Sequence, residues 1–334
     1  MGTASAGNPD TMSRTRLYRD GVLEAEDFPV DEVSKRLDDP AAVVWLDLCD
    51  PTEDDFATIA DELSLHRLAV EDALHARQRP KLDRYEKHSF LNTYAVRFDS
   101  GPGQLDVTEI SAFITENALV TVHKSGQFDI DALTRRWDEA DNLAKAGVGF
   151  LVHGLLDYVV DGQFEAVQAL DEQLEELEDL VFDDSADHAE VQQRSSRLRK
   201  SLVALRRVVL PMREVVDTLM RRGLRIVDDE LAPYFEDVRD HVRHASEWTD
   251  SLRELVATIR ETQLNIQGNR LNIIMKKVTS WAAIIAVPTA ITGFYGQNVP
   301  YPGFEQSWGF WVSTVAIIAV SAGLYTIFKR RDWL

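Results

Sequence analysis

The 334-residue sequence predicts an α/β cytoplasmic domain that continues into long stalk helices and ends in two C-terminal transmembrane helices. Three observations predict this fold class. Strand signals in residues 41–128 stop near residue 128, helical periodicity follows from residue 129, and two stretches near the C-terminus lack charged residues. Hydrophobic residues make up 45% of the chain and the net charge is −20, which excludes a disordered chain and a protein whose main partner is nucleic acid.

Residues 1–40 are polar with scattered acidic residues, so we expect a flexible N-terminal segment. It contains no charged region followed by an apolar one, so we expect no secretion signal and a cytoplasmic N-terminus. Residues 41–128 form the predicted α/β domain, in which acidic residues after Pro51 mark a helix start. The predicted strands are the apolar runs 42–48, 90–98, 107–114 and 118–122.

Residues 129–228 are predicted to form long antiparallel helices. Leucines recur at three- and four-residue spacing among acidic residues in 170–181, which is typical of an amphipathic helix with an acidic face. Residues 188–222 show a second helical pattern that carries Arg194, Arg197, Arg199, Lys200, Arg206 and Arg207 among other basic residues, so two helices of opposite charge can pair. Such surface ion pairs are worth only about 0–1 kcal/mol each.

Residues 229–277 are predicted as a stalk helix that leads into the membrane. The uncharged stretches 278–295 and 307–328 are each long enough to cross a hydrocarbon layer of about 30 Å as a helix. Basic residues precede the first stretch and follow the second, in the tail 329–334, whereas the loop 296–306 has no Lys or Arg. This distribution predicts a multi-pass protein of the plasma or inner membrane with both termini in the cytoplasm.

Residues that are nearly all small or polar repeat at three- and four-residue steps along the stalk and the first span. They are Glu261, Asn265, Gly268, Asn272, Met275, Thr279, Ala282, Ala286, Thr289 and Gly293. Small residues within a span permit close helix packing, and a polar face also suits a water-filled pore. One helical hairpin cannot enclose a pore, so the second interpretation requires a ring-shaped homo-oligomer.

The first span ends in the motif Tyr295-Gly296-Gln297-Asn298. With this motif the chain resembles the CorA family of magnesium channels, whose signature at this place is Tyr-Gly-Met-Asn; Gln297 departs from the family's Met. The resemblance extends over Trp45–Leu334. Further matching segments are Leu68–Asp72, Gln78–Lys81, Pro233–Asp237, Asn269–Asn272 with Met275-Lys276, and the basic tail that ends in Trp333-Leu334.

The resemblance implies a homopentameric funnel in membrane lipid, with the first span lining the pore and the second surrounding it. It implies Mg²⁺ as transported and regulatory ion, and no organic cofactor. The implied pore and filter residues are Gly296, Gln297, Asn298, Thr289, Ala286, Met275 and Asn272. The implied regulatory metal ligands are Asp72 and Asp237, with Glu71 and Glu261 as weaker candidates. Asn298 can alternatively cap the helix end, and the two aspartates can be solvated surface acids.

The resulting prediction is a channel for passive Mg²⁺ uptake, driven by the membrane potential and gated by intracellular Mg²⁺, with Co²⁺ and Ni²⁺ as further candidate ions. Neutral oxygen ligands such as Asn298 amides and Gly296 carbonyls suit a hydrated Mg²⁺ ion, because they bind it weakly enough for release. The sequence shows no phosphate-binding loop of the kind that would indicate an ATP-driven pump. It also shows no nucleophile–base arrangement of the kind that would indicate an enzyme. The alternatives are a related zinc transporter and a membrane-anchored sensor or scaffold without transport.

Overall fold

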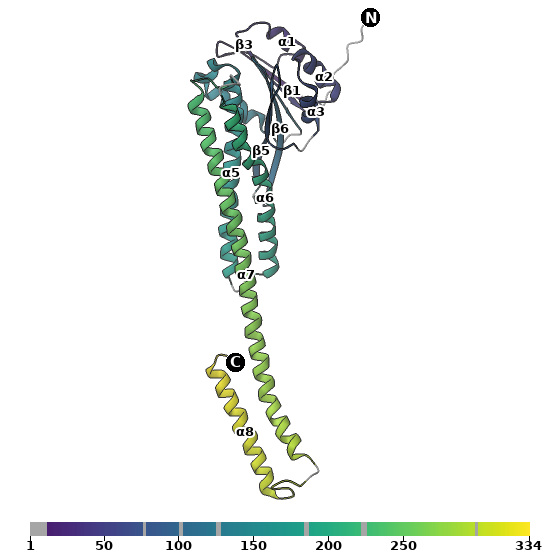
Figure 1. Ribbon diagram of the computed structural model, residues 1–334, viewed down its shortest axis with the longest axis vertical. Coiled ribbons are helices and arrows are strands. Elements are labelled where there is room, and N and C mark those ends of the chain that lie inside the picture. Colours follow the sequence, from purple (N-terminus) through teal and green to yellow (C-terminus); the bar gives the residue numbers. More distant parts are fainter. Residues whose placement is uncertain are drawn as a thin grey trace. The chain divides into compact units, whose positions relative to one another are not determined.

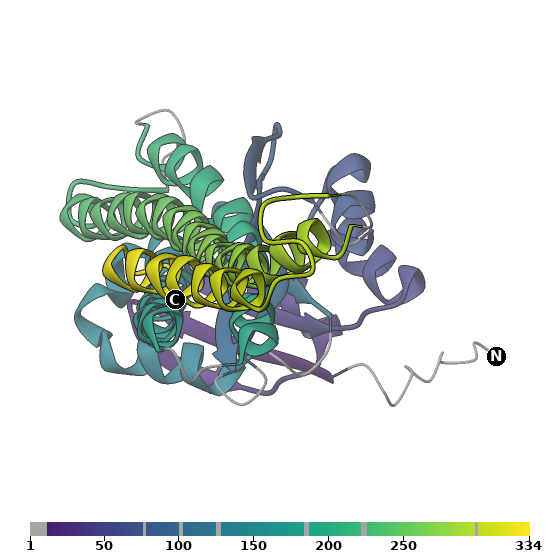
Figure 2. The same ribbon diagram turned by 90° about the horizontal axis from the view of Figure 1, so that it is seen from below.

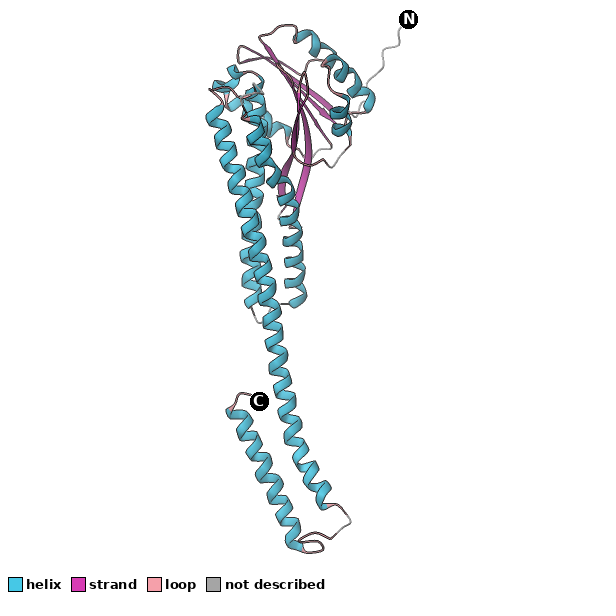
Figure 3. Cartoon of the chain, viewed as in Figure 1, coloured by secondary structure: helices cyan, strands magenta, loops and turns pink. Residues whose placement is uncertain are grey.

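The computed structural model describes residues 12–75, 78–99, 103–124, 128–183, 187–221, 226–297 and 300–334. The chain divides into two compact units, Met1–Ala257 and Thr258–Leu334. Within the described residues, all strands lie in the first unit, while the second consists of helices and a connecting loop (Figure 3). The boundary between the two units falls inside a long helix, Ala232–Tyr295.

The strands form one seven-stranded mixed sheet with the order β2-β1-β3-β7-β6-β5-β4. Only β3 and β7 pair in parallel, while the other neighbours are antiparallel. All four predicted strands are present, as β3, β5, β6 and β7. The strand bounds are β1 Met12–Arg19, β2 Val22–Glu26, β3 Ala42–Cys49, β4 Lys81–Arg84, β5 Ser89–Asp99, β6 Gln104–Ile114 and β7 Ala118–His123.

The prediction of a flexible segment over residues 1–40 is wrong for residues 12–36. Strand β1 pairs with β3 along its whole length, and the short helices η1 (Val30–Glu32) and α1 (Val33–Arg36) follow β2. The buried side chains of Leu17, Phe28 and Val33 pack against the start of β3. A few apolar residues therefore keep this segment folded against β3, which lies further along the chain. The composition of the segment alone does not reveal such contacts.

Helices cover both faces of the sheet (Figures 1 and 2). On one face, α2 (Glu53–Glu62) and α3 (Arg67–Leu74) contribute Phe56 and Ala69 to a core with strand side chains. Helix α2 begins at Thr52 because the hydroxyl of Thr52 and the carboxylate of Asp55 each accept a hydrogen bond from the other residue's backbone N–H. The sheet's other face packs against α4 (Ile130–Glu139) and α5 (Val148–Phe182).

The core between the sheet and helices α4 and α5 contains an aromatic pair that joins the sheet to α4. The rings of Trp45 and Trp137 lie 4.9 Å apart, edge to face. Helix α5 passes so close to Trp137 that a Cβ atom at Gly154 would lie 2.3 Å from the indole nitrogen. A glycine is therefore required at this crossing, which fixes α5 against the α/β domain.

Helices α5 and α6 (His188–Leu219) pack side by side and confirm the predicted pair of long helices. A short 3-10 helix, η2 (Asp141–Ala146), precedes α5. Arg194 on α6 lies 3.5 Å from the Glu176 carboxylate on α5, an ion pair of the predicted kind. Leu170, Leu174 and Leu177 of the acidic segment are buried, as the amphipathic pattern predicts.

The predicted stalk helix and first span form one continuous helix, α7 (Ala232–Tyr295), of 64 residues. At 1.5 Å per residue it is about 96 Å long. The helix continues through Pro288. One turn later, the Thr292 hydroxyl donates a hydrogen bond to the Pro288 carbonyl at 2.9 Å. Helix α8 (Ser307–Arg330) then runs antiparallel to the end of α7 (Figure 1). Both helices are long and apolar enough to span a membrane.

Candidate functional site

The predicted pore residues lie along the part of α7 that belongs to the second unit. Asn272, Met275, Ala286 and Thr289 are all exposed in the single chain, and Met275 is 61% exposed. Large apolar side chains on other sides of the same segment are exposed as well, including Ile285 at 63%. Exposure therefore does not separate the two faces. The predicted pore face is distinguished by residues that are small or polar apart from Met275, whereas the large apolar side chains lie mostly on the other sides.

Thr289 and Asn272 differ in how their polar groups are satisfied. The Thr289 hydroxyl donates to the Ile285 carbonyl one turn earlier at 3.1 Å, so its hydrogen is used within the helix and its oxygen lone pairs remain exposed. In the described part of the chain, no hydrogen bond engages the Asn272 amide. Its carbonyl oxygen and amino group are thus available to water or to a hydrated ion.

The predicted filter begins where α7 ends. The Gly296 N–H donates to the Thr292 carbonyl at 2.8 Å, and the Gln297 N–H donates to the Phe294 carbonyl at 3.3 Å. Both Gly296 and Gln297 are exposed. Asn298, the central residue of the predicted filter, lies outside the described residues. Its predicted role therefore stays a prediction.

An aromatic cluster supports the loop after the filter motif. The rings of Tyr295 and Tyr301 lie 5.1 Å apart, and the Phe294 and Phe304 rings lie 6.1 and 5.3 Å from that of Tyr301. The Tyr301 hydroxyl also donates to the Tyr295 carbonyl at 2.7 Å. Tyr301 lies in the predicted loop 296–306, but no role for it was predicted. Its contact with Tyr295 depends on the loop folding back onto the end of α7.

The same loop is anchored to the start of α8. Gly303 has a φ of +94°, and a Cβ atom there would lie 3.0 Å from the ring of Trp308. Glycine at this position permits both the left-handed backbone and the close approach of the indole. The filter motif is therefore followed by a loop that is fixed at both of its ends.

The predicted regulatory residue Asp72 lies on α3 and forms an ion pair with Lys81 on β4. The Lys81 ammonium is 2.7 Å from the carboxylate of Asp72 and 2.7 Å from that of Asp83. Partial burial alone would lower the pKa of Lys81, but hydrogen bonds to the two carboxylates outweigh it and the pKa lies above its ordinary value. The predicted metal ligand Asp72 is thus already paired with the Lys81 ammonium. This ion pair could not be predicted from the sequence.

The predicted regulatory residue Asp237 lies in the second turn of α7, with a side chain that is 67% exposed. The Nδ1 atom of His241, one turn further along α7, lies 4.0 Å from the carboxylate. The weaker candidates Glu71 and Glu261 are exposed too. Among the described residues, no group of three or more His, Cys, Asp or Glu side chains could hold a metal ion.

The chain has an α/β domain, a stalk helix and two candidate membrane spans, the first of which has a largely small and polar face. This arrangement is typical of a membrane protein of the transporter class. The family model described as "CorA-like Mg2+ transporter protein" matches residues 40–330. The chain belongs to this family and is a divalent cation transporter. Membership of a transporter family also supports the prediction that it is not an enzyme.

Curated relatives carry related descriptions. The chain is 27% identical to "Cobalt/magnesium transport protein CorA" of Thermotoga maritima, over 98% of this chain and 96% of the relative. It is 23% identical to "Zinc transport protein ZntB" of Yersinia enterocolitica, over 87% of this chain and 88% of the relative.

A solved structure shares the fold. It is the complete CorA magnesium transporter of Methanocaldococcus jannaschii, which matches with a TM-score of 0.78 at 23% identity and covers 97% of this chain and 99% of that one. The α/β domain with long helices and two C-terminal membrane helices is thereby confirmed as the fold class.

Proposed function

We propose that five copies of this chain form a channel that admits Mg²⁺ passively, driven by the membrane potential. The observation that carries the proposal is the small, polar and exposed face of α7 that leads directly to Gly296 and Gln297. A membrane anchor without transport would not require polar residues such as Asn272 and Thr289 along a span. A ring of α7 helices buries this face around a common axis and leaves the large apolar residues to lipid and to α8.

Ion selection follows from the chemistry of the ligands. Mg²⁺ loses its water reluctantly and prefers octahedral oxygen ligands, so a ring of Asn298 amides and Gly296 carbonyls would bind the hydrated ion through its water shell. Neutral ligands bind a divalent ion weakly enough for it to leave. A membrane potential contributes about 4.6 kcal/mol per 100 mV to the entry of a divalent ion, so inward flow needs no ATP.

We further propose that both termini lie in the cytoplasm and that intracellular Mg²⁺ closes the channel. The acidic first unit would then lie on the side where Mg²⁺ accumulates. In the described part of one chain, neither Asp72 nor Asp237 belongs to a group of three or more His, Cys, Asp or Glu side chains that could hold a metal ion, so Mg²⁺ would join carboxylates of neighbouring subunits. Bound Mg²⁺ would offset repulsion between the acidic subunits and stabilise the closed ring.

A zinc transporter is the second candidate function, favoured by Gln297 in place of the family's Met and by the zinc-transporting relative. The decisive experiment is metal-resolved uptake by the purified protein in liposomes, with Mg²⁺, Co²⁺, Ni²⁺ and Zn²⁺ compared at an imposed potential. Saturable Mg²⁺ uptake that increases with an inside-negative potential supports the first function. Uptake of Zn²⁺ without Mg²⁺ would replace it with the second, and uptake of neither would leave a sensor or scaffold.

A further inference from the structure

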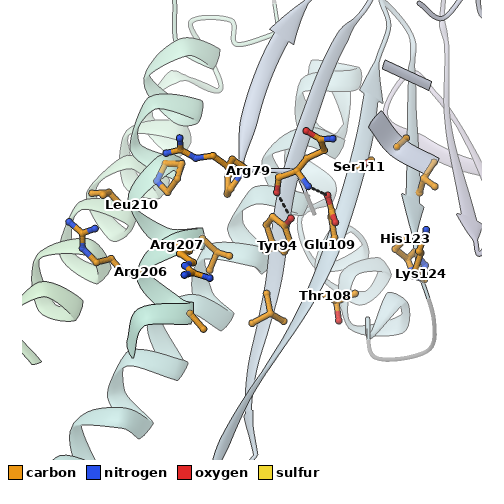
Figure 4. A pocket seen from close by; sticks show the side chains of 18 residues that line it. Arg79, Tyr94, Thr108, Glu109, Ser111, His123, Lys124, Arg206, Arg207 and Leu210 are labelled. Carbon is orange, nitrogen blue, oxygen red and sulfur yellow. Dashed lines mark hydrogen bonds between the residues drawn. The ribbon is translucent and has the colours of Figure 1, made fainter. Parts of the chain in front are cut away.

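A cavity of about 850 Å³ lies between the sheet and α6 in the first unit (Figure 4). Its walls come from the end of α3, the segment before β4, the strands β5, β6 and β7, and residues 204–211 of α6. The volume lies in the range of pockets that hold small-molecule ligands. The described lining includes none of the predicted pore or regulatory residues.

The charge of the described lining is positive, although the whole chain carries a net charge of −20. Arg79, Lys124, Arg206 and Arg207 line the cavity, against the single carboxylate of Glu109. Hydrogen bonds already engage that carboxylate: Glu109 Oε1 accepts from the Gln78 N–H at 3.0 Å and from the Asn92 amide at 2.9 Å. The cavity is therefore a local positive field in an acidic protein, which attracts small anions.

Two of the four cations are held by the protein itself. The Lys124 ammonium donates to the Leu74 carbonyl at 2.9 Å, and Arg206 Nε donates to Asp250 Oδ1 at 2.7 Å. The other two differ. In the described ranges, neither the exposed Arg79 nor the exposed Arg207 has a hydrogen-bond or ion-pair partner. They come from different elements, the segment before β4 and α6 (Figure 4).

The remaining described lining combines polar side chains with an apolar wall, and the polar ones are Gln78, Tyr94, Thr108, Ser111 and His123. The His123 side chain is 4% exposed, its Nε2 atom contacts Asp47 at 3.1 Å, and its Nδ1 atom has no hydrogen-bond partner among the described residues. Val107, Val208 and Leu210 contribute apolar surface. An occupant of this cavity would thus meet free guanidinium groups together with apolar side chains.

We propose that this cavity binds a phosphate-bearing small molecule, with Arg79 and Arg207 as the groups that hold its phosphate. A guanidinium binds phosphate through two parallel charge-assisted hydrogen bonds, which makes arginine the residue suited to this anion. The apolar wall leaves room for an organic group attached to the phosphate, such as a nucleoside. This binding site is separate from the pore, so the proposal does not depend on transport.

The experiment is calorimetric titration of the full-length protein in detergent, without divalent ions, using inorganic phosphate, pyrophosphate and ATP as probes. We expect saturable binding by the unaltered protein. Arg79→Gln and Arg207→Gln are each expected to weaken binding at least tenfold, because each removes hydrogen bonds between charged groups. Tighter binding of ATP than of pyrophosphate would show that the site also contacts the third phosphate or the nucleoside, and equal affinities would confine the contacts to two phosphates.

Arg199→Gln is the matched control, because Arg199 is exposed on the same helix and lies outside the described lining. It removes the same charge and is expected to leave the affinity unchanged. Two results would overturn the proposal. One is that none of the three anions binds saturably to the unaltered protein, and the other is that Arg199→Gln weakens binding as much as the two cavity variants do.

Discussion

The hydroxyl of Tyr301 donates a hydrogen bond to the backbone carbonyl of Tyr295 at 2.7 Å, joining the loop after the filter motif to the last residue of α7. The last four carbonyls of a helix have no partner within the helix, so the tyrosine satisfies a group that would otherwise require water. In the proposed channel, this hydrogen bond fixes the backbone immediately before Gly296.

Tyr301→Phe tests the role of that hydrogen bond. The substitution keeps the ring contacts and removes a hydrogen bond worth about 0.5–1.5 kcal/mol. We expect a folded oligomer with Mg²⁺ uptake reduced severalfold, measured in liposomes. Tyr325→Phe is the control, because Tyr325 lies on α8 and is 42% exposed. Equal uptake by Tyr301→Phe and the unaltered protein would show that the loop does not position the filter.

Asn298→Ala tests the filter itself. We expect it to abolish selective Mg²⁺ uptake because it removes the ring of amide oxygens that would hold the hydrated ion. The oligomer should remain folded, as judged by size-exclusion chromatography, since a residue at a pore mouth contributes little to a core. Uptake at the unaltered rate would exclude Asn298 from the filter and favour its alternative role as a helix cap.

Gln297→Met restores the residue usual in the family and asks what the glutamine contributes. Gln297 is exposed, and its N–H bonds to the Phe294 carbonyl through the backbone, so the substitution leaves that contact in place. We expect transport to persist with at most a change in preference among Mg²⁺, Co²⁺, Ni²⁺ and Zn²⁺. Complete loss of conduction would show instead that the filter depends on the glutamine amide.

The sequence predicted best those elements whose signal is local. The apolar run at 42–48 and the unbroken periodicity of α7 depend on neighbouring residues, and both were found. Strands β1 and β2 were missed because β1 is held by pairing with β3, and a short polar strand gives no periodic signal of its own. Tertiary pairing, rather than propensity, decides such segments.

The same distinction applies to the candidate sites. The polar face of α7 could be predicted because it follows from spacing along one helix. The ion pair of Asp72 with Lys81 could not, because it requires β4 to lie beside α3, and neither the sheet order nor that contact is visible in the sequence. The cavity between Arg79 and Arg207 was missed for the same reason.

Lys81→Gln tests whether the resident ammonium competes with Mg²⁺ for Asp72. Removing a cation 2.7 Å from the carboxylate should strengthen metal binding there. A half-exposed ion pair is worth up to about 1 kcal/mol, so we expect inhibition by internal Mg²⁺ at concentrations up to about fivefold lower. Lys35→Gln, an exposed lysine on α1, makes the same change in charge elsewhere. Coincident inhibition curves for the two variants would exclude competition at Lys81.

The last prediction concerns Asp72 and Asp237 together. If they hold bridging Mg²⁺ between subunits, ions that enter the cytoplasm stabilise the closed ring and uptake limits itself. The double variant Asp72→Asn/Asp237→Asn should shift inhibition by internal Mg²⁺ to higher concentration or remove it. It should also reduce Mg²⁺-dependent protection of the stalk against protease. The fold should persist, because Lys81 keeps Asp83 as a partner at 2.7 Å and Asp237 is exposed.

Asparagine is the informative replacement because it removes the charge without adding one. Lysine would also supply a cation where Mg²⁺ binds, and could favour closure by imitating the bound ion. The matched control is Asp54→Asn/Asp240→Asn, which neutralises exposed acids on α2 and α7 and so changes the overall repulsion equally. Uptake is measured against internal Mg²⁺ for the unaltered protein and both double variants. If the Asp72/Asp237 variant gives the inhibition curve of the unaltered protein, these two residues do not form the sensor. If its inhibition curve shifts only as far as that of the control variant, the overall charge of the subunits rather than a metal site accounts for the effect.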